Sequence, residues 1–260
     1  VIGEKILWTK NNKEELENVD PESEGEFTFT VRLKDTITID SEQDNNFSHI
    51  AQSVITAQVG EVSERIEVMG NQAVTKINST YTVNVEAHYY DFEGIQVGVG
   101  PNPPEVGEET VYRIYMVASN EANELSNGVL TMTLADNVKF TSKSSTNVGN
   151  ISTSGKNATW RIGNIPAYTG RFNDNIEAFV EVSYTPTEED AGAVPNLTSL
   201  IEFSAIDTFK EQELEKEIEN TTTNLEGDAY NSTSGEVVGE NGADDNQEEG
   251  DDGVQVNINP

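Results

Sequence analysis

Apolar and polar residues alternate along many short stretches of this 260-residue chain. A period of two is typical of strands that bury one face. Groups rich in Ser, Asn, Gly and Thr separate these stretches and predict turns at 126–128, 154–157 and 168–170. Many short strands joined by polar turns predict an all-β sandwich. The clearest alternating stretches are 26–33, 81–87, 111–117, 129–134 and 178–184.

Two parts of the sequence can be aligned with each other, which predicts repeated domains. Trp8 and Phe27 are 19 residues apart, as are Trp160 and Phe179, and the two copies are offset by 152 residues. The alignment assigns 210–221 to a final strand, although the spacing of Leu214 and Ile218 in this charged stretch would also fit a helix. The first copy consists of 7–9, 26–31, 53–57 and 61–78, and the second of 159–161, 178–182, 199–205 and 211–224.

The repeat predicts tandem immunoglobulin-like β-sandwich domains. Residues 77–226 form one complete unit, whereas 1–76 match only its second half and form either half of a domain or a short version of it. Three explanations stay open for this half: a cut inside a domain, independent folding, or completion by strands of another chain, since a half-sandwich exposes strand edges. Residues 227–252 read as an acidic flexible linker, and 253–260 as a lone strand that begins a further repeat or is donated to a neighbour.

The charge balance limits the partners of the chain. It has 15 Lys and Arg against 47 Asp and Glu, a formal net charge of −32. Nucleic acid binding needs a basic surface, and an anionic membrane repels an acidic protein. Strong acidity keeps an exposed protein soluble and favours divalent cations.

The chain has no cysteine, which excludes disulfides, a thiol nucleophile and thiolate metal sites. No apolar run is long enough to span a bilayer, and the first residues lack the features of a signal peptide. If the protein is exported, we expect its signal and anchor to lie outside this sequence.

A recognisable pattern runs through 89–91, 99–114, 119–120, Leu134, 159–163, 179–186, 204–207 and 222–225. Through these stretches the chain resembles the bacterial cell-surface "conserved repeat" domains, an immunoglobulin-like family found along large exported proteins, especially the version in long surface proteins of small-genome uncultivated bacteria. The resemblance covers 77–226 and, in half form, 1–76. It implies an extracellular location at the cell surface and says little about activity.

Some residues of this pattern have clear structural roles. Pro101, Pro103 and Pro104 cannot donate to a ladder and mark an edge or loop, and nearby glycines permit turns. The repeated tryptophans are expected to be core anchors, with sugar stacking as the alternative. The predicted structural core is Trp8, Phe27, Phe29, Tyr112, Trp160 and Phe179.

Catalytic patterns are weak in this sequence. His49 and His88 are the only histidines, they belong to different repeats, and no nucleophile-elbow motif accompanies them. We therefore predict no enzyme activity. Calcium is the most plausible ligand, because acidic loops offer the oxygen atoms that this cation prefers, although such loops can simply be solvated. The calcium candidates are Asp40, Asp44, Asp136, Glu188, Asp190 and Asp207.

The sequence thus predicts a non-enzymatic structural component of a bacterial cell-surface protein, stalk, coat or filament. Its expected partners are other copies of itself or adjacent repeats, with no nucleic acid and no direct membrane insertion. The alternative is an adhesin module that binds a host or neighbour-cell glycan or protein. Tyr89, Tyr90 and Phe92 are the local candidates for an exposed aromatic cluster of that kind, unless they pack at a domain junction.

Overall fold

The computed structural model describes residues 5–32, 37–60 and 65–239 and is all-β apart from two short 3-10 turns within these residues. The chain divides into two compact units, 1–38 and 39–260. Within the described residues, no helix is both long enough and apolar enough to cross a bilayer.

The first unit has no strand among its described residues and one 3-10 turn, η1 (Glu14–Leu16). The Trp8 ring packs against Phe27 at 5.4 Å and against Phe29 at 5.9 Å between ring centroids. The strand expected at 26–33 is therefore wrong for 26–32, and residue 33 lies outside the described residues. Alternation alone does not make a strand, because its backbone also needs a ladder partner.

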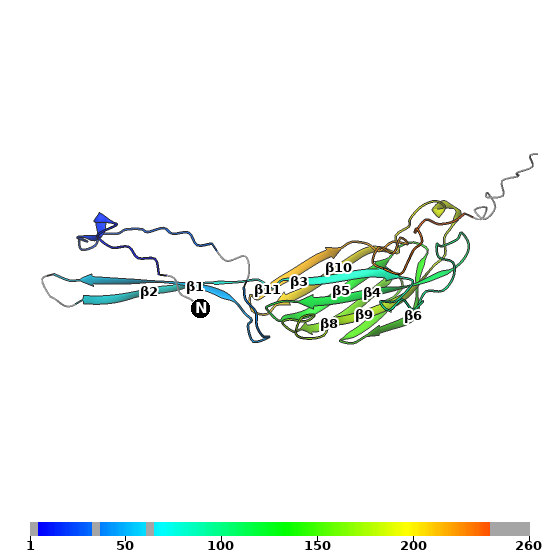
Figure 1. Ribbon diagram of the computed structural model, residues 1–260, viewed down its shortest axis with the longest axis horizontal. Coiled ribbons are helices and arrows are strands. Elements are labelled where there is room, and N and C mark those ends of the chain that lie inside the picture. Colours follow the sequence, from blue (N-terminus) through cyan, green and yellow to red (C-terminus); the bar gives the residue numbers. More distant parts are fainter. Residues whose placement is uncertain (1–4, 33–36, 61–64, 240–260) are drawn as a thin grey trace, which may run out of the picture. The chain divides into compact units, whose positions relative to one another are not determined.

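The described residues of the second unit form three antiparallel sheets (Figure 1). A two-stranded sheet, called here the ribbon, consists of β1 (Ser48–Gln58) and β2 (Arg65–Lys76). The other two sheets have the strand orders β3-β4-β9-β6 and β11-β10-β5-β8-β7. Their strands are β3 (Tyr81–His88), β4 (Thr110–Asn120), β5 (Leu125–Leu134), β6 (Val138–Thr146), β7 (Asn150–Ser154), β8 (Asn157–Ile165), β9 (Ile176–Tyr184), β10 (Thr198–Asp207) and β11 (Gln212–Ile218).

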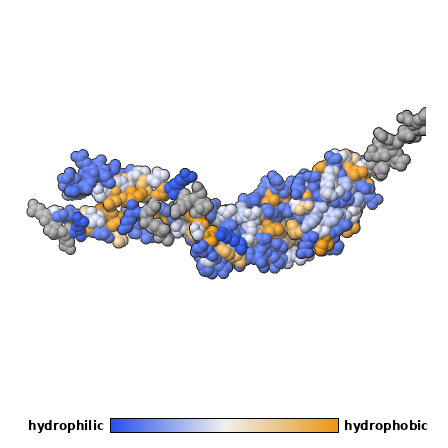
Figure 2. Space-filling view, in the orientation of Figure 1, coloured by the Kyte–Doolittle hydropathy of each residue, from blue (hydrophilic) through white to orange (hydrophobic). Residues whose placement is uncertain are grey.

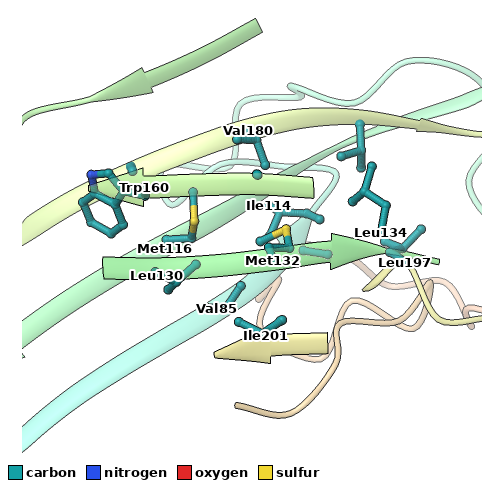
Figure 3. Packing of buried hydrophobic residues seen from close by; sticks show 14 of the residues in the cluster. Val85, Ile114, Met116, Leu130, Met132, Leu134, Trp160, Val180, Leu197 and Ile201 are labelled. Carbon is teal, nitrogen blue, oxygen red and sulfur yellow. The ribbon is translucent and has the colours of Figure 1, made fainter. Parts of the chain in front are cut away.

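The four-stranded and five-stranded sheets form a β-sandwich because each turns its apolar face to the other. Every second residue of β4 is buried from Thr110 to Asn120, and the inward residues of β5, β8 and β10 belong to the same core cluster. In Figure 3, Ile114 of one sheet lies beside Met132 of the other, and Met116 lies beside Trp160. The strands predicted at 81–87, 111–117, 129–134 and 178–184 are confirmed, as is the final strand, β11.

Two predicted turns are confirmed and one is wrong. Residues 154–157 and 168–170 form turns, but 126–128 lie inside β5. Asn127 has a φ of 54°, and the pairing with β8 shifts register between Leu125 and Gly128. The turn-forming residues therefore produce a bulge, which needs the same unusual backbone conformation.

The loop between β3 and β4 depends on two glycines. A Cβ on Gly98 would lie 2.2 Å from the Tyr89 ring, and one on Gly100, whose φ is 92°, would lie 2.1 Å from the Glu109 carbonyl oxygen. A side chain would clash at either position, and the positive φ of Gly100 also favours glycine there. Tyr89 Oη donates a hydrogen bond to the Gly100 carbonyl over 2.7 Å, so the loop is closed onto the sandwich.

The predicted linker is wrong for its described part, 227–239. Asp228 is buried and accepts hydrogen bonds from the backbone of Tyr89 and Tyr90, both at 2.8 Å. Val237 is 3% exposed and belongs to the core cluster. The Asp228 carboxylate thus caps backbone N–H groups, and Val237 is buried in the core. Together these two residues hold an otherwise polar segment on the sandwich. The remaining predicted linker and the strand at 253–260 lie outside the described residues.

Candidate interaction surfaces

The ribbon has one face without formal charge. Residues that lie opposite each other on paired strands share a face. On the uncharged face Ile55 lies opposite Val68, Ala57 opposite Ile66, and Ala51 opposite Ala73. The other face carries Glu67 and Arg65 near the end of the pairing. We call the uncharged surface of 49, 51, 53, 55, 57, 66, 68, 73 and 75 the ribbon face.

Apolar side chains of the ribbon are exposed to an unusual degree. Ile55 is 64% exposed and Val68 57%, and apolar surface is visible over this part of the molecule in Figure 2. The sheet has two strands, so each keeps one edge without a ladder partner in the described chain. A two-stranded hairpin is marginally stable in water, and apolar surface with open edges marks an interaction site. The other exposed apolar residues of the two strands are Ile66 on the ribbon face and Ile50, Val54, Met69 and Val74 on the opposite face.

A buried polar network lies where the ribbon joins the sandwich. Asn123 Nδ2 donates to Asp207 Oδ2 over 2.8 Å and to the Ile77 carbonyl over 3.0 Å. The backbone N–H of Ser79 donates to the same carboxylate over 3.3 Å, and the Ser79 hydroxyl donates to Asn120 Oδ1 over 2.8 Å. This network connects the chain that leaves β2 with the loop after β4 and with the end of β10.

The Asp207 carboxylate stays charged although the residue is 1% exposed. Burial would raise its pKa, but hydrogen bonds from Asn123 and from the backbone of Lys210, Ser79 and Phe209 outweigh burial and lower the pKa below its usual value. The donations from Phe209 and Lys210 to Oδ1 are both 3.0 Å long. Its oxygens are thus occupied by protein donors, which assigns Asp207 a structural role.

A polar cleft of ≈ 550 Å³ lies beside this junction. Two carboxylates, Glu42 and Glu124, line it together with amide side chains. Because its walls are hydrophilic and open, it lacks the apolar enclosure of a typical small-molecule site. The remaining lining residues are Gln43, Asn45, Asn46, Pro166, Ala167, Asn173 and Thr208.

The structure does not bring the six calcium candidates together. Among the described residues, no three His, Asp or Glu side chains form a group that could hold a metal ion. Asp44 accepts hydrogen bonds from the backbone of Asp40 and Ser41, each 3.0 Å long, and these lower its pKa. Calcium binding by this chain stays a prediction.

Two of the three other candidates have side-chain partners within the protein. Asp136 pairs with Lys156, and this hydrogen bond is the main cause of its lowered pKa. Glu188 and Asp190 lie in the second 3-10 turn, η2 (Glu188–Asp190), where Asp190 accepts a hydrogen bond of 2.8 Å from the Thr187 backbone. These contacts give each carboxylate except Glu188 a role in a loop or turn.

The predicted core residues differ in their burial. Trp160 and Tyr112 are 1% and 0% exposed in the sandwich. Phe27 and Phe29 are 39% and 46% exposed, and Trp8 is half-buried. The expected equivalence of Trp8 and Trp160 is therefore wrong: one indole lies between two sheets, and the other packs on two rings in a unit without strands.

Phe179 points away from the core, contrary to prediction. Its neighbours Ala178 and Val180 are buried, so the period of two places Phe179 on the outer face of the four-stranded sheet. There it packs on Tyr115 at 5.8 Å and lies under the Arg113 guanidinium at 4.6 Å. Phe92 continues this row and is 55% exposed, with its ring 4.9 Å from Tyr115.

This aromatic row is a second candidate surface, and sequence reasoning found only one of its members. Tyr89 is 5% exposed and is held within the sandwich rather than at its surface. Tyr115 and Phe179 occupy outward positions of their strands, and the strict alternation of β4 is the signal that would have found Tyr115.

Comparison with known proteins gives matches in structure only. No protein-family model matches the chain, and no curated protein matches its sequence. A variant of BcpA, the major pilin subunit of Bacillus cereus, matches with a TM-score of 0.34 and 12% identity over 68% of this chain and 64% of that chain. The full-length major pilin SpaD from Corynebacterium diphtheriae matches with a TM-score of 0.32 and 9% identity over 75% of this chain and 64% of that chain.

An inactive GH20 exo-β-N-acetylglucosaminidase from Vibrio harveyi also matches, with a TM-score of 0.30 and 10% identity over 55% of this chain and 18% of that chain. This chain covers less than two thirds of each of the three proteins. Because the TM-scores are low, these likenesses decide nothing about the activity of the chain.

Proposed function

We propose that the chain is a non-enzymatic structural component of a bacterial cell-surface protein, stalk, coat or filament. In this proposal the sandwich is a spacer, and the ribbon face binds other copies of the chain or adjacent repeats of the same protein. The uncharged ribbon face is the observation that carries the proposal. In a chain with a net charge of −32, a surface without charge on open strands is best explained by contact with another protein.

The test is the mass of the chain in solution. Light scattering after size exclusion, over a range of concentrations and with and without calcium, is expected to show oligomers. Ile55→Lys with Val68→Lys places two charges on the ribbon face and is expected to lower the oligomer mass at each concentration, because an unpaired charge at a buried contact is costly. Thr56→Lys is the matched control, since Thr56 lies on the opposite face, across from Glu67.

An oligomer mass in the double variant that equals that of the wild type at every concentration would contradict the assigned surface. A wild-type chain that stays monomeric at every concentration, with and without calcium, would contradict the proposed self-association.

The aromatic row supports the adhesin alternative. Exposed Phe92 beside Tyr115 offers stacking surface for a sugar or an aromatic side chain, and Arg113 supplies a charge beside it. Binding of the wild type to a glycan panel that is lost in Phe92→Ala, and kept in the exposed control Tyr230→Ala, would favour this reading. A panel without any bound glycan would contradict the glycan form of this alternative.

A further inference from the structure

The two edge strands of the five-stranded sheet have opposite character. At one edge, β11 turns Glu213, Glu215 and Glu217 to the outer face, because its inward positions are those paired with buried residues of β10. At the other edge, β7 turns Asn150, Ser152 and Ser154 to the same outer face, and all three are exposed. We call these three-residue rows the acidic row and the amide–hydroxyl row.

The pairing places both rows on one face of one sheet. Ser152 lies opposite Thr159, which lies opposite Thr131, and Thr131 lies opposite Glu202. Glu202 in turn lies opposite Glu217. This rung crosses the whole sheet, so it fixes which side chains meet when a further strand is added at either edge.

The charged residues around β7 and around β11 also differ in sign. Residues 137–173 contain no Asp or Glu and five Lys or Arg, although the whole chain has 47 acids against 15 bases. This stretch includes β6 and β7. Lys143 of β6 is 70% exposed and lies 3.1 Å from Glu181, and Lys156, just after β7, pairs with Asp136. By contrast, 211–219 contain five Glu and one Lys.

We infer that β7 of one copy adds to β11 of the next, so that the five-stranded sheet continues from chain to chain. This inference deepens the proposed function and rests on it, because it names a contact between copies. The amide–hydroxyl row can donate hydrogen bonds to the acidic row, and the bases near β7 meet the acids near β11.

Charge repulsion disfavours the two symmetric contacts, β11 with β11 and β7 with β7. Two β11 strands from different copies would place one row of glutamates against another, which is destabilising. Two β7 strands would bring together two stretches that carry only bases. A contact between β7 of one copy and β11 of another avoids both repulsions. Because this contact is heterologous, it leaves a free edge strand at each end of the assembly, to which further copies can add.

The absence of cysteine in the chain makes cross-linking a clean test. Full-length Ser152→Cys chains are mixed with tagged Glu215→Cys chains and oxidised gently at physiological salt. Disulfides form between residues on adjacent strands whose side chains meet, so heterodimers are expected in excess of both homodimers. A mixture of Thr131→Cys with Glu215→Cys chains measures random collision, since Thr131 is exposed on the same face but lies on a central strand.

An added charge checks the same contact without cross-linking. Ser152→Glu places an acid against the acidic row and is expected to weaken association roughly fivefold. Adding Glu215→Lys in the same chain is expected to restore the association. A thermal melt of each variant confirms that the sandwich is intact.

The outcomes separate this inference from the proposed function. Heterodimers at the level of the Thr131 control, or wild-type association in Ser152→Glu, overturn the edge contact while an oligomeric wild type leaves the proposed function standing. A chain that is monomeric at all concentrations overturns both.

Discussion

The ribbon and the sandwich are built from the same kind of strand but differ in what covers them. In β4 every second residue is buried, whereas in β1 and β2 no residue is buried. Among the described residues, the strands of the sandwich have a facing sheet, and those of the ribbon do not. Alternation together with a ladder partner therefore makes a strand, but a second layer makes a core. A ribbon without that layer leaves its apolar side chains exposed, where another chain can pack on them.

The largest expected effect separates the two regions by stability. Trp160→Ala is expected to lower the free energy of unfolding by about 3–5 kcal/mol, because the indole is 1% exposed and fills the space between two sheets. Urea unfolding followed by circular dichroism measures this change. A loss as small as that of a surface substitution would show that packing between the two sheets contributes little to the free energy of unfolding.

A smaller effect is expected at the junction of the two regions. Asp207→Asn is expected to cost about 1–3 kcal/mol at neutral pH, because an amide cannot accept all of the hydrogen bonds that the carboxylate accepts. Urea unfolding measures the loss. The exposed Asp136→Asn is the control, and an equal loss in both variants would contradict the structural role of Asp207.

The same carboxylate predicts a dependence on pH. Hydrogen bonds lower the folded pKa of Asp207, so its contribution is complete above the unfolded pKa of about 4 and is lost as the pH falls through the lower, folded value. The stability difference between the wild type and Asp207→Asn should therefore shrink only in acid, below about pH 4. A difference that disappears on the alkaline side instead would refute this assignment.

The smallest effect is expected on the ribbon face. Ile55→Ala and Val68→Ala are expected to change the stability of the monomer by no more than about 0.5 kcal/mol, because neither side chain is buried within the chain. Their effect should be seen in association, where apolar area is lost from the contact. Unfolding and light-scattering measurements made in parallel separate monomer stability from association. A large loss of monomer stability would show that these side chains pack against another part of the same chain.

Much of the sandwich could be predicted from the sequence. Its strands alternate strongly, and burial of Tyr112 and Trp160 follows from their size and position in such strands. Phe179 was harder, because adjacent apolar residues leave the inward parity of β9 undecided until the facing sheet is known. The stretch 26–32 alternates as well as any true strand, but no local pattern reveals whether a ladder partner exists.

The candidate surfaces depend on pairing that sequence does not reveal. The ribbon face and the acidic row follow from register, and a shift by one residue would exchange their faces. Likewise the segment 227–239 has the composition of a linker, and Asp228 and Val237 hold it on the sandwich through partners far away in sequence. Local composition cannot report such long-range contacts.

Amide hydrogen exchange at rising protein concentration tests the central claim most directly. We predict that protection of 48–58 and 65–76 increases with concentration, as the ribbon becomes covered, while β4 and β5 stay protected throughout. Ribbon amides that exchange equally fast at every concentration, or that match the sandwich even in dilute monomer, would contradict the account.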